Sequence, residues 1–530
     1  MALSDMLERG YFPEELPNPF VTTSFASAVT GSGATLPADF KKGFSGGYPS
    51  VRSARPGKYS HARRGLLRRR LCLPNPLLHY LLCREIDANW GVLQPHIGGT
   101  VLSATNPVQA ARGRSIQPAQ PLAAGPGLAV RTRLNSKYVL RTDITRFYYS
   151  IYTHAIPWAL HTKPVAKGNT GHALLGNQID YLVRNGQDKQ TVGIPVGPDT
   201  SLVIAEILMQ ACDKELLDAC RGLHGHRFID DYELGFRSRA EAEDAFDTLE
   251  RILAGYELAL NPSKTQVTEL PCNLEAPWVS PLRSFPFEGT ASSQQGELWG
   301  FFDLAFELHG QYPDDGVLQF ALGRLRRLEV APSNWKLFQR LLLNCAAPEP
   351  ATLRWVLASI TSGASADAPP VLSDIEEVMN SLIIDHSAVA HSSEVAWALW
   401  GCLALGMTVS AKAAAAVSKC DDSVVALLAL HCEDQGLVST PLDRTVWSSY
   451  MNQDSLYGEH WLLAYEANVK GWLPSQGGSD HVSADSNFGF LKTAGVSFYD
   501  KSKAVRASPG APIPVPNLPT PPAGFVASPS

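Results

Sequence analysis

Two adjacent aspartates stand between two short apolar runs near the middle of the chain, within residues 227–236. The flanking runs, Phe228-Ile229 and residues 232–236, favour β structure and predict a tight hairpin with both acids at its tip. Paired strands would hold Asp230 and Asp231 rigidly beside each other. Their like charges repel, and a divalent metal ion removes that repulsion, whereas the simpler interpretation is an ordinary polar turn. The choice depends on whether the chain supplies a third acid and a place for a nucleotide.

A third acid ends a strand-like stretch earlier in the chain. Residues 138–144 carry Asp143 at their end, directly before an aromatic cluster at 147–149. A Gly/Pro loop at 193–201 then opens onto a helical pattern at 202–220. The chain continues through the hairpin, a second helix at 240–255 and a strand-like stretch at 256–267. This order predicts an α+β sheet domain with its acids gathered at one end.

From about residue 291 the pattern becomes helical throughout. Leu, Ala and Trp recur at i, i+3 and i+4 spacing, with short links that often contain Pro or Gly. The predicted helices span 297–308, 317–328, 335–345, 351–360, 374–384, 394–405, 411–417 and 423–433. Such a series predicts stacked helical pairs in an all-α domain. His386 and His391 lie five residues apart here, but their helical, apolar surroundings favour packed or capping histidines over metal ligands.

The two ends of the chain differ in composition from the rest. Residues 1–50 are rich in Gly, Pro, Ser and Thr, which predicts a loosely ordered arm clamped by Phe12, Phe20 and Phe25. Residues 506–530 are crowded with proline, which predicts a disordered or polyproline tail.

Charge is distributed unevenly. The formal net charge is −6, yet residues 51–142 hold 15 Lys and Arg against only Glu85 and Asp87. Eight of these cations fall within residues 51–70 with no acid between them, and such a run repels itself without a partner. The asymmetry is an electrostatic footprint for a polyanion, either a nucleic acid or a triphosphate.

Cysteine usage and hydropathy bear on the compartment. The nine cysteines are scattered and never form a Cys-x-x-Cys pair, which favours reduced thiols in a cytoplasm over disulfides or a zinc site. No apolar run approaches the roughly 18 residues of a membrane span. The N-terminus lacks a basic region followed by an apolar core, so we expect no secretory signal and a cytoplasmic protein.

The motifs occur in an order that resembles the fingers–palm core of reverse transcriptases. Asp143 with its aromatic neighbours resembles motif A, residues 193–201 motif B, residues 228–231 motif C, and residues 258–265, including Lys264, motif D. Leu-Pro-Asn-Pro at 73–76 is similar to a fingers motif of bacterial members.

Within that superfamily, residues 147–154 and 197–201 are most similar to abortive-infection and other defence-associated bacterial reverse transcriptases. Those proteins carry an α-helical repeat domain in place of a conventional thumb. The helical C-terminal half of this chain resembles that domain. The resemblance implies four parts: an N-terminal arm (1–50), a reverse-transcriptase fingers–palm domain (51–290), an α-helical repeat domain (291–490) and a Pro-rich disordered tail (491–530).

The resemblance also implies site residues for two-metal DNA synthesis. Asp143, Asp230 and the carbonyl of Ile144 would bind two Mg²⁺ ions, or Mn²⁺, with Asp231 as a partial or indirect ligand. Tyr148 is expected to pack against the sugar and exclude a 2′-hydroxyl, which implies dNTPs as substrates. The other expected nucleotide-binding residues are Ser201, Lys264, Arg63 and Arg64. The expected nucleic-acid-binding residues are Arg68, Arg69, Arg70, Arg112 and Arg114.

Two positions depart from the family pattern. Val196 stands where motif B usually has Gln, and Phe228 where motif C usually opens with Tyr. Abortive-infection members share such changes, and some synthesise DNA without a template from a protein primer. The resemblance therefore implies RNA-directed or template-independent, protein-primed synthesis in anti-phage defence, by a homo-oligomer with a phage or host trigger protein. Candidate priming tyrosines in regions expected to be mobile are Tyr48, Tyr59 and Tyr499.

Three alternatives stay open at this point. An RNA-dependent RNA polymerase would use a similar palm. A catalytically silent scaffold would bind a phage or host protein through the helical domain, although the three clustered acids argue against it. Retrotransposition of the retron or group II intron kind is disfavoured, since no endonuclease, maturase or zinc-finger module follows the palm.

Overall fold

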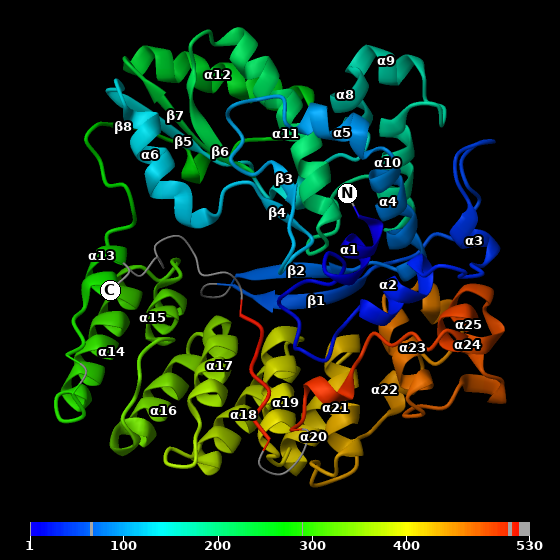
Figure 1. Cartoon of the computed structure of the whole chain (residues 1–530), viewed down its shortest axis with the longest axis vertical. Helices are drawn as coiled ribbons and strands as arrows, with labels where there is room; N and C mark the ends of the chain where they lie inside the picture. The colour runs from blue at the N-terminus through cyan, green and yellow to red at the C-terminus, as the bar shows by residue number, and fades with distance from the viewer. Residues whose placement is uncertain (1, 64–66, 289, 507–510, 519–530) are drawn as a thin grey trace.

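A four-stranded antiparallel sheet organises the first half of the chain in the computed structural model, which describes all residues except 1, 64–66, 289, 507–510 and 519–530 (Figure 1). Its strand order is β6-β7-β5-β8. The strands are β5 (Tyr138–Thr142), β6 (His224–Phe228), β7 (Asp231–Phe236) and β8 (Gln266–Glu269). Helices α11 (Thr200–Ala219) and α12 (Arg239–Gly255) pack against each other, and α12 covers β5 and β7. The predicted α+β domain is confirmed.

The strand expected at 256–267 is mostly wrong, because only its last residues extend into β8. Glu257 adopts a positive φ of 63°, and Pro262 begins a short 3₁₀ turn, Pro262–Lys264, where the Asn261 side chain caps Ser263. Proline offers no N–H for a strand ladder. The segment still serves the sheet, since Leu260 pairs with Ile144 in an isolated bridge next to Asp143.

The remaining elements of the first half surround this sheet. The cation-rich residues 51–70, called the basic block, contribute to a hairpin of β1 and β2. Helix α4 begins where the Asn75 side chain accepts from the Leu77 N–H and Pro76 occupies the first turn. These elements are β1 (Gly57–Ala62), β2 (Arg68–Leu73), α4 (Pro76–Ala88), α5 (Trp90–Ile97), β3 (Pro107–Gln109), β4 (Ile116–Pro118), α6 (Gly125–Arg133), α7 (Phe147–Ser150), α8 (Ala155–His161), α9 (Lys163–Gly168) and α10 (Leu175–Asn185).

Helices make up the second half, and each of the eight predicted segments is helical. Along the series, a helix contacts its successor or the helix after that: α14 meets α16, α16 meets α18, and α17, α19, α21 and α23 follow one another, as in stacked helical pairs. The helices are α13 (Val279–Ser284), α14 (Gln294–Gln311), α15 (Val317–Leu325), α16 (Pro332–Ala346), α17 (Leu353–Gly363), α18 (Leu372–Ser387), α19 (Ser392–Leu405), α20 (Ala411–Val417), α21 (Ser423–Asp434), α22 (Thr445–Ser448), α23 (Trp461–Val469), α24 (His481–Ala484) and α25 (Ser486–Thr493).

The loosely ordered N-terminal arm is a wrong expectation. Residues 2–50 form α1 (Leu3–Glu8), α2 (Thr23–Thr30) and α3 (Ala38–Lys41), and the expected clamps Phe12, Phe20 and Phe25 are all buried. Tyr11 is fully buried and stacks on His79, with ring centroids 4.1 Å apart. Aromatic side chains, rather than the polar composition, decide the order of this segment.

The disordered tail expected from residue 491 is also wrong for its first part. Phe498 is fully buried, with its ring centroid 5.5 Å from that of Phe25, and the Asp500 N–H donates to the Pro19 carbonyl at 2.7 Å. The two ends of the chain therefore pack together. Most of the proline-crowded end, residues 507–510 and 519–530, lies outside the described residues.

Candidate active site

The predicted hairpin is present, with a two-residue turn formed by Ile229 and Asp230. Phe228 pairs with Asp231, so Asp231 is the first residue of β7 and only Asp230 lies in the turn itself. Ile229 has a φ of +55°, which a β-branched residue rarely adopts, although two-residue hairpins favour it. Such a conformation persists only where the surroundings hold it in place.

Asp143 lies directly beside this hairpin. Thr142 pairs with Tyr232, so one further step of the same register places Asp143 opposite Asp231, on the same face of the sheet. On its other side, the Asp143 carbonyl accepts from the Asn261 N–H at 2.8 Å. Because peptide groups alternate along a strand, the Ile144 carbonyl faces the hairpin instead. The sheet thus brings together the four groups expected to bind metal.

The acids border a cleft of about 290 Å³, whose lining includes Asp143, Asp231 and Lys264. The Asp143 side chain is 7% exposed. One of its oxygens, Oδ2, forms an ion pair with Lys264 Nζ. Its other oxygen, Oδ1, is buried and has no hydrogen-bond partner among the described residues. A buried carboxylate oxygen without a partner is costly, and a bound cation would satisfy it.

The hairpin acids are hard to ionise together. Burial raises the pKa of Asp230 to about 7, and the charges of Asp231 and Asp143 add to the effect, while Lys264 opposes it. Burial likewise raises the pKa of Asp231, which Lys264 partly offsets. These all-oxygen donors suit a hard dication such as Mg²⁺, whose charge would favour the ionised carboxylates. The residues present therefore fit a divalent-metal site.

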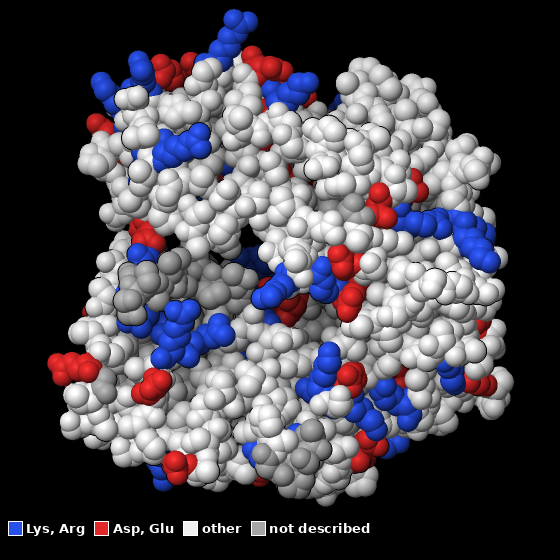
Figure 2. All heavy atoms as spheres, in the orientation of Figure 1, with Lys and Arg blue, Asp and Glu red and all other residues white. Residues whose placement is uncertain are grey.

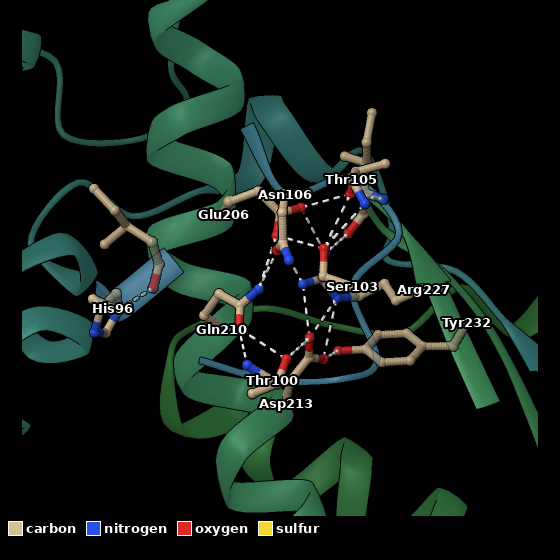
Figure 3. Close-up of polar contacts among 12 residues, drawn as sticks. His96, Thr100, Ser103, Thr105, Asn106, Glu206, Gln210, Asp213, Arg227 and Tyr232 are labelled. Atoms are coloured by element: carbon tan, nitrogen blue, oxygen red, sulfur yellow. Dashed lines mark hydrogen bonds and ion pairs between the residues drawn. The ribbon is translucent and has the colours of Figure 1, made fainter. Parts of the chain in front are cut away.

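A buried polar network supports the hairpin from below, and Figure 3 shows how its side chains converge. Arg227, in β6, is fully buried and donates five hydrogen bonds, 2.7–3.1 Å long, to the carboxylates of Glu206 and Asp213. Its Nη1 also donates to the Ile229 carbonyl at 2.7 Å. The Ile229 N–H donates to Thr105 Oγ1 at 3.0 Å. Both peptide groups of the left-handed turn residue are thus held by this network.

Helix α11 and the segment before β3 hold the network in turn. Glu206, Gln210 and Asp213 share one face of α11, and Gln210 donates to Asn106 at 2.7 Å. The Ala104 N–H donates to the Arg227 carbonyl at 2.8 Å, so this segment also covers the edge of β6. We name Arg227, Glu206, Asp213, Thr105 and Tyr232 the hairpin buttress; the Tyr232 hydroxyl donates to Asp213 at 2.7 Å.

Sequence reasoning missed the buttress. Two signals were present: an arginine directly before the apolar pair of the hairpin, and two acids seven residues apart, on one face of a helix whose first half is largely apolar. Each signal is weak alone, because a lone Arg or Glu is usually solvated. Only their meeting in space shows that Arg227 lies between the two acids and pairs with both.

Tyr148 is the residue expected to contact the sugar. It is half-buried in α7, and its pKa is raised first by burial and second by the charge of Asp230, which puts its ring near the hairpin. The Ile194 N–H donates to the Tyr148 carbonyl at 2.8 Å. The backbone of Tyr148 is therefore tied to the Gly/Pro loop, while its side chain is close enough to Asp230 to be affected by that charge.

The Gly/Pro loop itself is anchored inside the protein. Ser201 is only 3% exposed, and its hydroxyl donates to the Pro195 carbonyl. Arg114 Nε donates to Asp199 at 2.6 Å, and its other nitrogens bind backbone carbonyls that include those of Gly10 and Gly197. Ser201 and Arg114, expected to touch nucleotide and nucleic acid, instead hold this loop together.

Three of the eight cations of the basic block pair with acids of the helical half. Arg68 forms a two-pronged ion pair with the buried Glu394 of α19, Arg52 pairs with Asp454 at 2.7 Å, and Lys58 pairs with Glu459 at 2.6 Å. The footprint interpreted from composition as a polyanion surface is thus partly an interface within the chain. Arg68 is no longer a candidate for nucleic-acid contact.

Other predicted cations remain accessible. Arg63, Arg70 and Arg112 are exposed and Arg69 is half-buried, while Arg64 lies outside the described residues. The charge of Arg69 lowers the pKa of Tyr148 against the effect of burial. Figure 2 shows the molecule hollowed between its two halves, with Lys and Arg gathered below the hollow over α15, where Arg326 and Arg327 are exposed.

The proposed mobility of the priming tyrosines is wrong for two of them. Tyr59 and Tyr499 are fully buried, and the Tyr499 hydroxyl lies 3.0 Å from His431 Nδ1. Tyr48 is 39% exposed, with its hydroxyl donating to the Thr170 carbonyl at 2.7 Å.

This sheet, with acids from neighbouring strands at a cleft, is the arrangement expected of a nucleotidyltransferase palm. Residues 103–293 match the family model described as reverse transcriptase (RNA-dependent DNA polymerase), and this stretch contains Asp143, Asp230, Asp231 and Lys264. The chain therefore carries a reverse transcriptase domain.

Other comparisons are sparser. No curated protein matches the chain. Among solved structures, apo telomerase from Candida tropicalis is similar at 9% identity with a TM-score of 0.33, covering 63% of this chain. The chain spans 65% of the length of that telomerase chain. Across the described residues, every helix is too short or too polar to cross a membrane.

Proposed function

We propose that the protein is an RNA-directed DNA polymerase that adds dNTPs with two Mg²⁺ ions, or Mn²⁺, held by Asp143, Asp230, Asp231 and the Ile144 carbonyl. One observation carries the proposal: acids from two neighbouring strands converge on a cleft in which Asp143 keeps a buried, unpartnered oxygen. Metal ions bound there would activate the attacking hydroxyl and neutralise the triphosphate charge.

The chain's own groups prepare this reaction. The buttress holds Ile229 in its left-handed conformation, and this fixes the direction of the Asp230 carboxylate. Lys264 compensates part of the acidic charge, and it lies where it can transfer its contact from Asp143 to a triphosphate. The Tyr148 ring would pack beneath the sugar, where a 2′-hydroxyl would collide with it. Arg69 and Arg70 would contact backbone phosphates, which are bound by charge and not by sequence.

A role in bacterial anti-phage defence is the finer part of the proposal. It rests on the similarity of residues 147–154 and 197–201 to defence-associated members and on the helical half that follows the palm. Self-assembly into a homo-oligomer and a phage or host trigger belong to the same proposal. For a protein primer, Tyr48 is the exposed candidate among the three tyrosines considered.

The experiment incubates purified protein with Mg²⁺ and labelled dNTPs or rNTPs, with and without an RNA template. DNA synthesis supports the proposal, and rNTP-only incorporation favours an RNA polymerase. Product that stays protein-linked after denaturation shows a protein primer, and Tyr48→Phe then identifies or excludes Tyr48. A phage challenge unaffected by Asp230→Ala/Asp231→Ala would instead favour a scaffold.

Tyr148→Ala sharpens the substrate assignment. Removing the ring opens space for a 2′-hydroxyl, so we expect the preference for dNTPs over rNTPs to fall by at least about tenfold, near the cost of one lost steric contact. Tyr149→Ala, on the neighbouring position of α7, is the matched control and should keep the preference. Competition between labelled dNTPs and rNTPs measures the ratio, and an unchanged ratio in Tyr148→Ala contradicts the gate.

A further inference from the structure

Two histidines and a glutamate meet at the junction between the helical half and the basic hairpin. His386 lies in the last turn of α18, His391 directly precedes α19, and Glu394 occupies the first turn of α19. The turn between the helices includes Ala390 at a positive φ of 53°, and it folds His391 back so that its N–H donates to the His386 carbonyl at 3.1 Å. The local backbone thus brings the side chains together.

The three candidate ligand atoms form a compact triangle. The two Nδ1 atoms of His386 and His391 lie 3.0 Å apart. Glu394 Oε1 lies 3.5 Å from His391 Nδ1 and 3.9 Å from His386 Nδ1. Tetrahedral Zn²⁺ with bonds of about 2.0–2.2 Å separates its ligand atoms by about 3.3–3.6 Å. The sides of the triangle, 3.0, 3.5 and 3.9 Å, lie within about 0.3 Å of that range, so small side-chain shifts would give one face of a tetrahedral site.

Neighbouring groups orient the glutamate. Ser393 Oγ donates to Glu394 Oε2 at 2.7 Å, and Arg68 Nη2 donates to the same oxygen at 2.9 Å. Arg68 also binds Oε1, leaving one lone-pair direction of that oxygen for a metal. Ligating carboxylates in proteins are usually held by such hydrogen bonds. The guanidinium charge nevertheless opposes a dication, so the site suits a strongly bound borderline metal rather than Mg²⁺.

We propose that His386, His391 and Glu394 bind a borderline transition-metal dication of the Zn²⁺ class. The site lies where the start of α19 contacts strand β1. Ser392 Oγ accepts from the Ser60 N–H at 3.2 Å, and Ser393 Oγ accepts from the Ala62 N–H at 2.8 Å. A bound ion would brace the α18–α19 turn that docks onto β1 and β2. This inference is independent of the proposed polymerase activity.

The test titrates Co²⁺ into metal-free protein with Mg²⁺ in excess, so that Mg²⁺ occupies the oxygen-only palm site. A tetrahedral site with nitrogen donors gives visible absorption bands of a strength that six oxygen ligands do not produce. We expect one such Co²⁺ per chain, displaced by Zn²⁺. His386→Gln and His391→Gln should each weaken Co²⁺ binding by at least about tenfold, since each removes one of three protein ligands.

The matched control is His309→Gln in α14, a histidine of the same helical half outside the cluster, which should bind as the wild type does. Absence of the bands, or equal Co²⁺ binding by all three variants, overturns the proposal. The contact between His386 and His391 is then an N–H···N hydrogen bond between neutral imidazoles. If a ligand variant fails to fold by circular dichroism, X-ray absorption of the Zn²⁺-loaded wild type decides. Nitrogen and oxygen neighbours at about 2.0–2.2 Å support the site, and six oxygen neighbours refute it.

Discussion

Two sets of acids lie within the same palm, and they differ in how far neighbouring cations and hydrogen-bond donors compensate their charge. In the buttress, Glu206 and Asp213 are fully buried, and Arg227 together with hydroxyl donors satisfies their oxygens. At the cleft, Asp143 and Asp231 lie next to Asp230 of the turn. Lys264 pairs with Asp143, and one Asp143 oxygen lacks a partner among the described residues. Compensated charge builds structure, while uncompensated charge is held ready for a ligand of opposite sign.

The comparison is sharpest for the cleft acids. We expect Asp143→Asn and Asp230→Asn each to lower nucleotide incorporation at least about 1000-fold, because the metal loses an anionic ligand. Folding should be unimpaired, since each change relieves repulsion, and Asp231→Asn should lose less. Primer extension and thermal unfolding measure both effects. Asp244→Asn, exposed on α12, is the control; equal activity in the control and Asp143→Asn would remove Asp143 from the site.

The buttress should show the reverse pattern. Arg227→Met leaves two buried carboxylates without a cation, which costs about 3–5 kcal/mol of unfolding free energy. Arg227→Lys keeps the charge but cannot bind both acids and the Ile229 carbonyl together. We therefore expect partial recovery of stability, with kcat lowered and KM little changed, because the hairpin is mispositioned.

Chemical denaturation and steady-state kinetics distinguish these outcomes. Arg239→Met, which breaks the exposed pair with Glu243, should leave stability nearly unchanged, because solvent screens such a pair. If Arg227→Lys matches the wild type in kcat, Arg227 contributes to stability alone and does not position the hairpin.

Proton binding gives an intermediate effect. The pKa of Asp230 is raised to about 7 when folded, above its unfolded value, so the folded state holds the extra proton between these values. Stability of the metal-free protein should therefore fall as pH rises from about 4 to about 7 and then level off, lowering Tm by a few degrees. Mg²⁺ should reverse this loss at pH 8, because it binds the ionised form.

Scanning calorimetry at several pH values, with EDTA or Mg²⁺, checks the linkage. Asp230→Asn removes the titrating group, so its Tm should vary less with pH and respond less to Mg²⁺. A wild-type protein whose pH dependence matches that of Asp230→Asn would show that Asp230 is ionised without metal, contrary to the comparison.

The smallest effect concerns a single hydroxyl. Thr105→Val removes the acceptor of the Ile229 N–H and the donor to Glu206, and we expect a loss of about 1–3 kcal/mol. Thr105→Ser keeps the hydroxyl and should remain near the wild type. Urea unfolding of both variants measures the difference, and equal stability of Val and Ser would show that the turn does not depend on this contact.

The local sequence was sufficient to predict elements that are determined by the spacing of apolar residues. Alternating and helical periodicities located the hairpin, the helices on either side and the helical half, since each side chain's face follows from its own position. The order of Asp143, the Gly/Pro loop, Asp230-Asp231 and Lys264 indicated the reverse transcriptase domain, which the family match supports.

Contacts between residues far apart in the sequence could not be predicted from these local patterns. Polar composition made residues 2–50 look loose, although buried aromatic contacts with residues near 498 order them. Charge counting made Arg68 look like a nucleic-acid ligand, although Glu394 neutralises it 326 residues away along the chain. Local patterns record which groups are charged, but not which opposite charge folds against them.

The same division runs through the hairpin. Its two acids and its turn follow from ten consecutive residues, because strand propensity and a two-residue turn are local properties. Whether the acids are paired or left open depends on Asp143, Lys264 and Arg227, which only the sheet register and the packing of α11 bring into place. Electrostatic energy depends on distance in space, and that distance is set by the tertiary structure.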